Sequence, residues 1–180
     1  MKRLIAFVLL MLLAVCPALA EDTVSHYRVG DPIADFTLTT WDGIEFNMLK
    51  ALEEKDVVII HFWAGWCGAC EEEMILFRDI FAEYGDRVAL IAVATTDDHT
   101  EKALRTYCTR RDITYLVAQD TAGLTDAFSV RTLPSTMVVD KEGVLREVKQ
   151  GALTGIEEFA ALVEAYLAPL DAADAIPVQE

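Results

Sequence analysis

The hydrophobic positions of this chain follow two periods that alternate along the sequence. Continuous apolar runs rich in β-branched residues are typical of strands buried on both faces, whereas apolar residues three and four positions apart indicate amphipathic helices. These patterns predict strands at 57–60, 88–94 and 115–117, and helices at 100–111, 124–128 and 156–167. A further helix is predicted after a CxxC motif and ends at Gly85. Strands and helices therefore alternate through most of the chain.

Two segments carry the signals of β-hairpins. Residues 36–38 and 44–46 flank the dipeptide Asp42-Gly43, which favours a tight turn. Residues 136–139 and 144–148 are joined by a second short turn that also ends in glycine. Alternating strands and helices followed by a hairpin and a helix predict an α/β fold, with a mixed central sheet covered by helices on both faces and a hairpin at its N-terminal side.

The first twenty residues have the composition of a secretory signal. Residues 1–3 include Lys2 and Arg3, residues 4–15 are apolar, and Ala18-Leu19-Ala20 fits a cleavage site with small residues at its first and third positions. We therefore expect a signal peptide at 1–20, cleaved after Ala20, and a protein that is periplasmic or otherwise exported. An uncleaved membrane anchor at residues 4–20 is the alternative, although this stretch is marginal for the ~20 residues that a span requires.

The remainder is long enough for one domain with a substantial core. We expect a single domain at 21–168, of which residues 21–33 pack loosely, and a flexible tail at 169–180, where helical periodicity has ended. The net charge of −15 makes the surface acidic. Such a surface repels nucleic acid, which we exclude as a partner, and it also repels anionic membranes.

The cysteines outside the signal peptide are Cys67, Cys70 and Cys108. The first two form a CxxC, which is either half of a zinc site or a redox pair. A structural zinc ion needs four nitrogen or sulfur ligands, and this chain has no second CxxC and only three scattered histidines. We predict a redox pair and neither metal nor cofactor. Cys108 lies on the apolar side of a predicted helix. It is either a small buried hydrophobic residue or a third redox thiol.

The CxxC lies where a buried strand gives way to a helix. Free amides and the positive end of the helix dipole stabilise a thiolate at the first helical positions. Cys67 is therefore the candidate nucleophile. Cys70, about one turn further into the helix, is placed to resolve a mixed disulfide formed on Cys67.

The segment Phe62-Trp63-Ala64-Gly65-Trp66-Cys67-Gly68-Ala69-Cys70 resembles the active-site motif of thioredoxin-fold proteins. Over roughly residues 29–167 the chain is similar to the TlpA/ResA-like periplasmic thiol–disulfide oxidoreductases, with a leading hairpin, an inserted strand and helix, and Leu133-Pro134 before a strand. The resemblance implies a thioredoxin fold. It also implies that Pro134 is cis, faces the disulfide and, with Leu133 and Trp66, holds the substrate; an ordinary turn proline is the alternative.

Three consecutive acids, Glu71, Glu72 and Glu73, follow the pair. Glu71 is four residues after Cys67 and Glu73 is three after Cys70, so helical spacing allows both near the sulfurs; a solvated face is the alternative. In the ResA-like proteins a glutamate at the position of Glu73 is tied to acid–base behaviour. Negative charge there disfavours a thiolate, and a strong oxidant needs a stabilised thiolate, so a reductant is favoured.

His61 stands six residues before the first cysteine, where thioredoxin carries a buried acid that assists proton transfer. A histidine could relay protons there, because its ordinary pKa is close to neutrality. It could equally be a satisfied histidine inside the sheet. The sequence leaves open whether His61 or Glu73 deprotonates Cys70.

These features predict a protein-disulfide oxidoreductase that reduces disulfides of exported client proteins. By resemblance, a transmembrane dithiol protein would supply its electrons. The alternatives are a disulfide-forming oxidase and a metal-binding protein similar to copper carriers, although those carriers have a CxxxC, one residue longer than the motif here. A peroxidase of this fold would have threonine where this chain has Ala64.

Overall fold

The structure is a computed structural model that describes residues 26–95 and 100–167. Its centre is a five-stranded sheet in the order β5–β4–β3–β6–β7, in which β3, β4 and β5 are parallel and β6 and β7 are antiparallel. The strands are β3 (Val57–Trp63), β4 (Val88–Ala94), β5 (Leu116–Gln119), β6 (Ser135–Asp140) and β7 (Leu145–Gln150). The predicted mixed sheet is confirmed.

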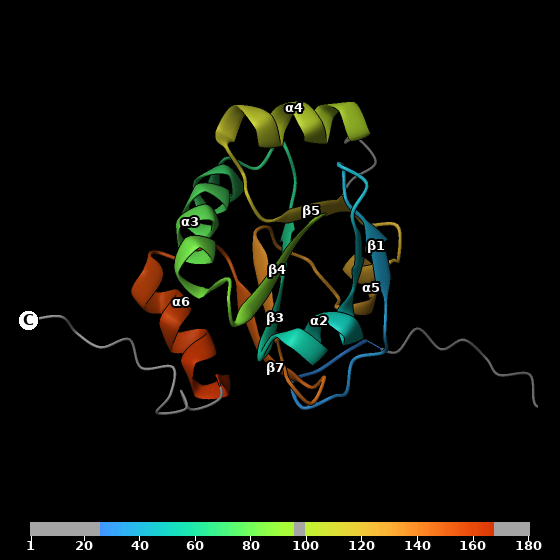
Figure 1. Cartoon of the computed structure of the whole chain (residues 1–180), viewed down its shortest axis with the longest axis vertical. Coiled ribbons are helices and arrows are strands. Elements are labelled where there is room, and N and C mark those ends of the chain that lie inside the picture. Colours follow the sequence, from blue (N-terminus) through green and yellow to red (C-terminus); the bar gives the residue numbers. More distant parts are fainter. Residues whose placement is uncertain (1–25, 96–99, 168–180) are drawn as a thin grey trace, which may run out of the picture.

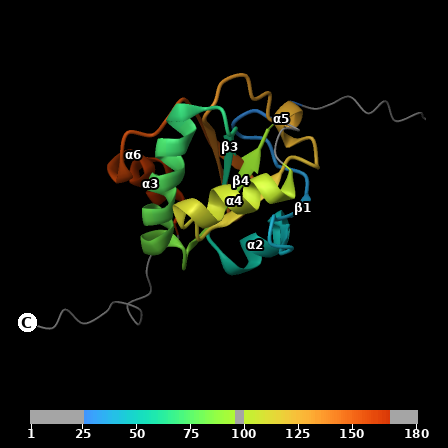
Figure 2. The same ribbon diagram turned by 90° about the horizontal axis from the view of Figure 1, so that it is seen from above.

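Helices cover both faces of this sheet. They are α2 (Met48–Glu54), α3 (Gly68–Tyr84), α4 (Glu101–Arg111), α5 (Leu124–Ala127) and α6 (Ile156–Val163), the last continuing as a 3-10 turn, Glu164–Tyr166. In Figure 1, α3 and α6 lie on one side of the sheet, α2 and α5 lie on the other, and α4 crosses the top. The view from above shows α4 running across the end of the sheet beside α3 (Figure 2).

Strand β3 is the middle strand, and all of its residues are buried. Successive side chains of a strand point to opposite faces. Ile59 and Trp63 belong to the hydrophobic cluster under α3 and α6, whereas Ile60 and Phe62 belong to the cluster under α2 and α5. The same alternation directs His61 towards α3.

The predicted hairpin near the N-terminus is also present. Its strands are β1 (Thr37–Thr39) and β2 (Glu45–Asn47), and Leu38 is paired with Phe46 across them. Gly43 has a φ of 87°, a conformation that glycine adopts without the penalty of a Cβ. A bridge between Thr40 and Ala118 attaches the hairpin to β5, so it shields that edge of the central sheet.

Within the residues that the structure describes, the N-terminal half differs from the sequence-based expectations in two ways. The sequence patterns did not predict α2, a short helix that begins after the N-cap residue Asn47. The segment expected to pack loosely instead pairs with the sheet: Pro32 forms a bridge with Val144, the Gly30 N–H donates to the Leu145 carbonyl, and Ile33 is buried. Edge strand β7 offers free backbone groups near its start, and this segment satisfies them.

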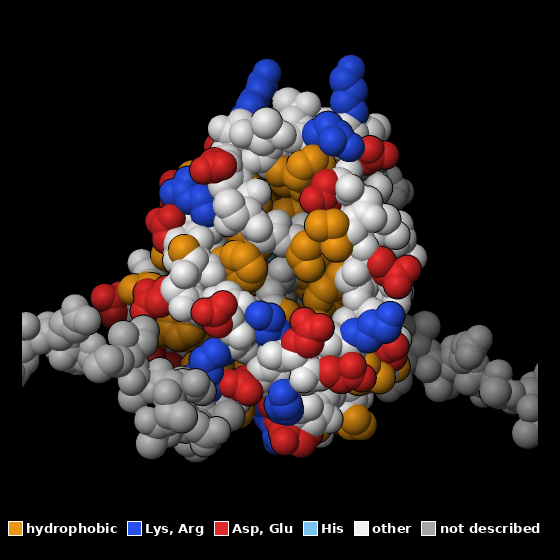
Figure 3. Space-filling model, in the orientation of Figure 1, with side chains coloured by type: hydrophobic (Ala, Val, Ile, Leu, Met, Phe, Trp, Pro, Cys, Tyr) orange, Lys and Arg blue, Asp and Glu red, His pale blue; other side chains and the backbone are white. Residues whose placement is uncertain are grey.

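The predicted signal peptide, its cleavage site and the tail at 169–180 lie outside the described residues, so the predicted domain limits remain predictions. Within residues 26–95 and 100–167, no helix combines the length and apolar character needed to cross a membrane. On the face shown in Figure 3, hydrophobic side chains gather below α4, and acidic and basic side chains surround them.

Candidate active site

Cys67 is the N-cap residue of α3. Its backbone is extended, with φ −90° and ψ 102°, and its Sγ accepts a hydrogen bond from the Cys70 N–H at 3.2 Å. The first amides of a helix have no partners within the helix, so an acceptor at this position is stabilised by them. The strand-to-helix placement expected from the sequence is therefore confirmed, and Cys67 occupies the position where a thiolate is most favoured.

Cys67 and Cys70 form a disulfide, with an S–S distance of 2.08 Å. The two cysteines differ in accessibility: Cys67 is 9% exposed, whereas Cys70 is completely buried. The neighbouring Trp66 is 69% exposed and projects from the surface beside them. A protein that approaches the site therefore meets Cys67 and Trp66 before it meets Cys70.

Glu73 lies one turn past Cys70 on α3 and is 1% exposed. Its Oε1 accepts a 2.9 Å hydrogen bond from the backbone N–H of Leu153, in the loop between β7 and α6. Burial disfavours the ionised carboxyl and raises the pKa of Glu73 to about 7, against the opposing effect of the Leu153 N–H. Glu73 is thus an acid that exchanges its proton near neutral pH.

His61 is fully buried next to Glu73. Its Nδ1 lies 3.7 Å from Oε2 of Glu73 and 3.3 Å from Oγ1 of Thr136, which is the residue paired with His61 on β6. Burial disfavours the imidazolium and lowers the pKa of His61 to about 3. The ring is therefore neutral at physiological pH. Its other nitrogen, Nε2, has no hydrogen-bond partner within residues 26–95 and 100–167.

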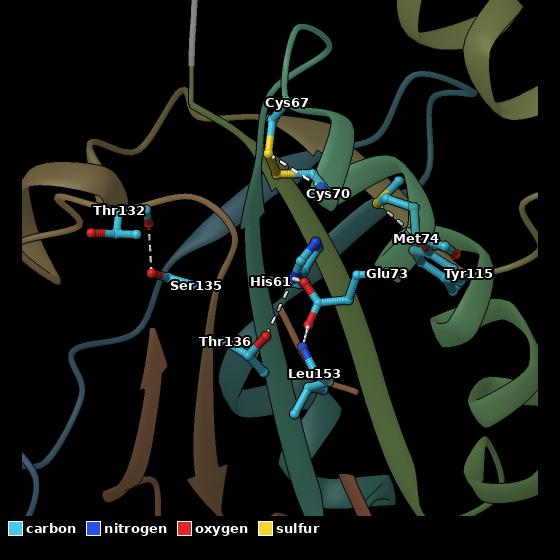
Figure 4. A network of polar contacts seen from close by, with 10 residues as sticks. All are labelled: His61, Cys67, Cys70, Glu73, Met74, Tyr115, Thr132, Ser135, Thr136 and Leu153. Atoms are coloured by element: carbon cyan, nitrogen blue, oxygen red, sulfur yellow. Dashed lines mark hydrogen bonds and ion pairs between the residues drawn. A yellow bond between two sulfur atoms is a disulfide. The ribbon is translucent and has the colours of Figure 1, made fainter. Parts of the chain in front are cut away.

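Figure 4 shows these groups together. The disulfide lies above, the His61 ring lies beneath it with Nε2 directed towards Cys70, and the Glu73 carboxyl lies beside Nδ1. The His61 and Phe77 rings pack in an edge-to-face arrangement, with 4.7 Å between ring centroids. The structure therefore brings together the two acid–base candidates and the cysteine pair.

The three acids after the pair have different surroundings. Glu71 is exposed and forms an ion pair with Arg111 of α4, Glu72 is exposed, and only Glu73 is buried. The expectation that Glu71 acts on the sulfurs loses its basis, because Arg111 compensates its charge. Of the three acids, Glu73 alone therefore places a buried, uncompensated carboxyl near the sulfurs, where its charge disfavours a thiolate.

Leu133 and Pro134 precede β6, whose residue Ser135 is paired with Phe62 of β3. The Leu133–Pro134 peptide bond is cis. The Pro134 carbonyl accepts a hydrogen bond from the Gly151 N–H at 2.8 Å, and Leu133 is partly buried. This loop thus lies next to the end of β3 that leads to Cys67.

Cys108 lies on the buried side of α4 and is 1% exposed. Burial raises the pKa of its thiol to about 12, so the thiol is protonated at physiological pH and unreactive. No group of three or more His, Cys, Asp or Glu side chains within the described ranges is arranged to hold a metal ion.

The sequence reasoning did not identify three residues of this site: Thr136, Leu153 and Arg111. Thr136 could have been found by pairing the predicted strands, because it lies opposite His61. Leu153 contributes only its backbone N–H, and Arg111 only an ion pair with a residue 40 positions away, so neither has a local signal in the sequence.

Comparisons with known proteins agree with this geometry. The family model described as AhpC/TSA family matches residues 29–148. The thiol-disulfide oxidoreductase ResA of Oceanobacillus iheyensis is 34% identical over 139 residues, which cover 74% of this chain and 71% of that protein. The thioredoxin-like protein YneN of Bacillus subtilis is 31% identical over 126 residues, covering 69% of this chain and 73% of YneN.

A solved structure has the same fold. The thiol:disulfide interchange protein of the thioredoxin family from Chlorobium tepidum superimposes with a TM-score of 0.68, covering 80% of this chain and all of that one, at 23% identity. Together with the motif and the sheet topology, these matches show a thioredoxin fold. This chain belongs to the AhpC/TSA family and is similar, within it, to the ResA-like thiol–disulfide oxidoreductases.

Proposed function

We propose that this protein is a thiol–disulfide oxidoreductase that reduces disulfides of exported proteins, with Cys67 as its attacking thiolate and Cys70 as its resolving thiol. The observation that carries the proposal is the position of Cys67: it caps α3, its sulfur receives the Cys70 N–H, and its side chain is the more accessible of the pair.

The proposed reaction has two exchange steps. The Cys67 thiolate attacks one sulfur of the client disulfide, forms a mixed disulfide and releases the other client sulfur as a thiolate. Cys70 then loses its proton and attacks Sγ of Cys67, which forms the intramolecular disulfide and releases the second client thiolate. Two electrons pass to the client, whose two thiolates take up two protons.

Glu73 is proposed as the acid–base group for the second step. Cys70 is completely buried, so its thiol needs a proton acceptor inside the protein. Glu73 lies one turn away and exchanges its proton near neutral pH. Ionised Glu73 also disfavours a thiolate nearby, which favours the oxidised protein and hence the reducing direction.

The proposed client site consists of exposed Trp66 and the loop residues Leu133 and Pro134. An exposed indole offers a large apolar contact at low entropic cost, and the loop residues lie beside the strand that leads to Cys67. Export through the signal at 1–20 and rearming by a transmembrane dithiol protein belong to the same proposal. Both depend on the sequence features and the family resemblance described above.

The test is trapping with reduced protein and a client whose single disulfide carries a label. Cys70→Ser should accumulate a mixed disulfide through Cys67, because the resolving thiol is absent. Cys67→Ser should accumulate none, because buried Cys70 cannot reach an exogenous disulfide. Equal trapping by both variants would contradict the assignment of roles.

Two measurements separate the competing functions. Alkylation trapping in cells should find the Cys67–Cys70 pair mostly as a dithiol if the protein is a reductant; a pair that is mostly oxidised would support a disulfide-forming oxidase. Metal analysis of the reduced protein tests the copper-carrier alternative. A stoichiometric metal ion bound to the reduced protein would favour a metal carrier over the proposed disulfide exchange.

A further inference from the structure

Three buried polar atoms form a connected series beneath the disulfide. Nε2 of His61 is directed towards Cys70, Nδ1 of the same ring lies 3.7 Å from Oε2 of Glu73, and both side chains are fully shielded from solvent (Figure 4). Among the residues that the structure describes, neither Nε2 nor Oε2 finds a hydrogen-bond partner. Two unsatisfied buried polar atoms are costly and call for an explanation, and a role in catalysis is one.

Thr136 can form a hydrogen bond with Nδ1 of His61 in either tautomer of the ring. Its Oγ1 lies 3.3 Å from Nδ1, and a hydroxyl both donates and accepts. It can accept from Nδ1–H when Nε2 is unprotonated, and it can donate to Nδ1 when the proton is on Nε2. A ring whose position is unchanged between its tautomers has the property that a proton relay needs.

We propose that His61 carries the proton of Cys70 to Glu73 during resolution of the mixed disulfide. This inference rests on the proposed function. As Cys70 attacks Sγ of Cys67, its thiol proton passes to Nε2 and the Nδ1 proton passes to the Glu73 carboxylate. The ring remains neutral and changes tautomer, Glu73 becomes protonated, and the sulfur–sulfur bond forms as the client thiolate leaves.

The neutrality of the ring is consistent with its surroundings. Phe77 of α3 and Ala92 of β4 are apolar neighbours, and Thr136 of β6 carries no charge. The charged groups that act on Glu73 are Glu158 and Lys149, which form an ion pair with each other. Tyr115 is a further titratable group nearby, and its hydroxyl donates a hydrogen bond to the Met74 carbonyl. Since an imidazolium is disfavoured in this pocket, a coupled transfer at both nitrogens is the route open to the ring.

The experiment measures the two exchange steps separately. Reduced protein is mixed with a short peptide cyclised by one disulfide, quenched with acid at intervals, and analysed by mass spectrometry for the mixed disulfide and the resolved product. His61→Phe retains a ring against Phe77 but has no nitrogen. It should leave formation of the mixed disulfide unchanged and slow its resolution on the order of 100-fold near neutral pH. The defect should shrink at alkaline pH, where hydroxide replaces the relay as the acceptor of the Cys70 proton.

Two further variants control for packing and test whether His61 and Glu73 act on the same route. Phe77→Leu disturbs packing against the ring without removing a proton carrier, so its resolution rate should keep the pH profile of the unaltered protein. The double variant His61→Phe/Glu73→Gln should be no slower than the slower single variant, because both changes interrupt one route. Multiplying defects would show that His61 and Glu73 act independently and would overturn the relay.

If His61→Phe does not fold, NMR of the unaltered protein still tests the proton relay. Nitrogen-15 shifts of the His61 ring should show the proton on Nε2 in oxidised protein below the pKa of Glu73, and on Nδ1 in reduced protein above it. One tautomer in both states would contradict the relay, as would a folded His61→Phe variant that resolves as fast as the unaltered protein. Should the unaltered protein leave the peptide disulfide unreduced and Cys70→Ser trap no mixed disulfide, the proposed function itself fails.

Discussion

The backbone N–H of Leu153 donates a 2.9 Å hydrogen bond to Oε1 of Glu73, joining residues 80 positions apart. This bond holds the carboxyl beneath the redox pair and leaves Oε2 facing His61. It also favours the ionised form, while burial favours the protonated form more strongly. The balance places the titration of Glu73 near neutral pH, where a group can both accept and release a proton during a catalytic cycle.

The first prediction concerns stability against pH in oxidised protein. Burial raises the pKa of Glu73 from 4.5 to about 7, so its contribution is fully present below 4.5 and is lost as pH rises towards 7. His61, whose pKa falls from 6.5 to about 3, acts in the opposite direction: its contribution is present above 6.5 and lost as pH falls towards 3. In the shared interval the two trends offset each other.

Glu73→Gln should therefore gain stability relative to the unaltered protein as pH rises from about 5 to about 8, by about 1 to 3 kcal/mol. Urea unfolding of both oxidised proteins at the two pH values measures this difference. Glu72→Gln is the matched control, because Glu72 is exposed on the same helix. A difference between Glu73→Gln and the unaltered protein that is independent of pH would show that Glu73 titrates normally.

The second prediction concerns the reduction potential. Glu73→Gln removes a charge that disfavours the thiolate, so the potential should rise by about 30 mV, equivalent to about 1.4 kcal/mol, above the pKa of Glu73 and by less below it. Redox titrations at two pH values and a titration of thiolate absorbance test this. Equal effects of Glu72→Gln on both measurements would mean that the acids form a solvated face with no specific role for Glu73.

The third prediction concerns client binding. Trp66 is 69% exposed, so Trp66→Ala should change the free energy of unfolding by less than about 0.5 kcal/mol. The same change should raise KM for a protein disulfide several-fold while reactivity towards a small disulfide remains unchanged. Kinetics with both substrates check the prediction; parallel losses with both would indicate that Trp66 supports the cysteines instead.

The fourth prediction concerns the ion pair between Lys149 and Glu158, whose side chains are each 29% exposed. Glu158 raises the pKa of Glu73 and Lys149 lowers it. Lys149→Met leaves Glu158 uncompensated and should raise the pKa of Glu73 by roughly half a unit at low salt, an effect that about 1 M salt should largely screen. Carbon-13 NMR of the Glu73 carboxyl measures it, and a fall in the pKa would contradict the assigned signs.

Local patterns in the sequence determined the architecture and the position of the redox pair. The buried run that became β3, the helical spacing of α3 and the Asp42-Gly43 turn each depend on residues close together in the chain. Strand and helix periods and turn chemistry act over such short distances. The position of Cys67 at the start of a helix follows from the same local information.

Tertiary structure alone decided the chemistry around that pair. Glu71, Glu72 and Glu73 are identical in type and adjacent in sequence, yet only Glu73 is buried, because α3 turns it towards the sheet and the Leu153 loop covers it. The partner of Glu71 is Arg111 of α4, and the direction of His61 depends on the sheet face that α3 covers. Desolvation and charge pairing set a pKa, and both are supplied by segments distant in sequence.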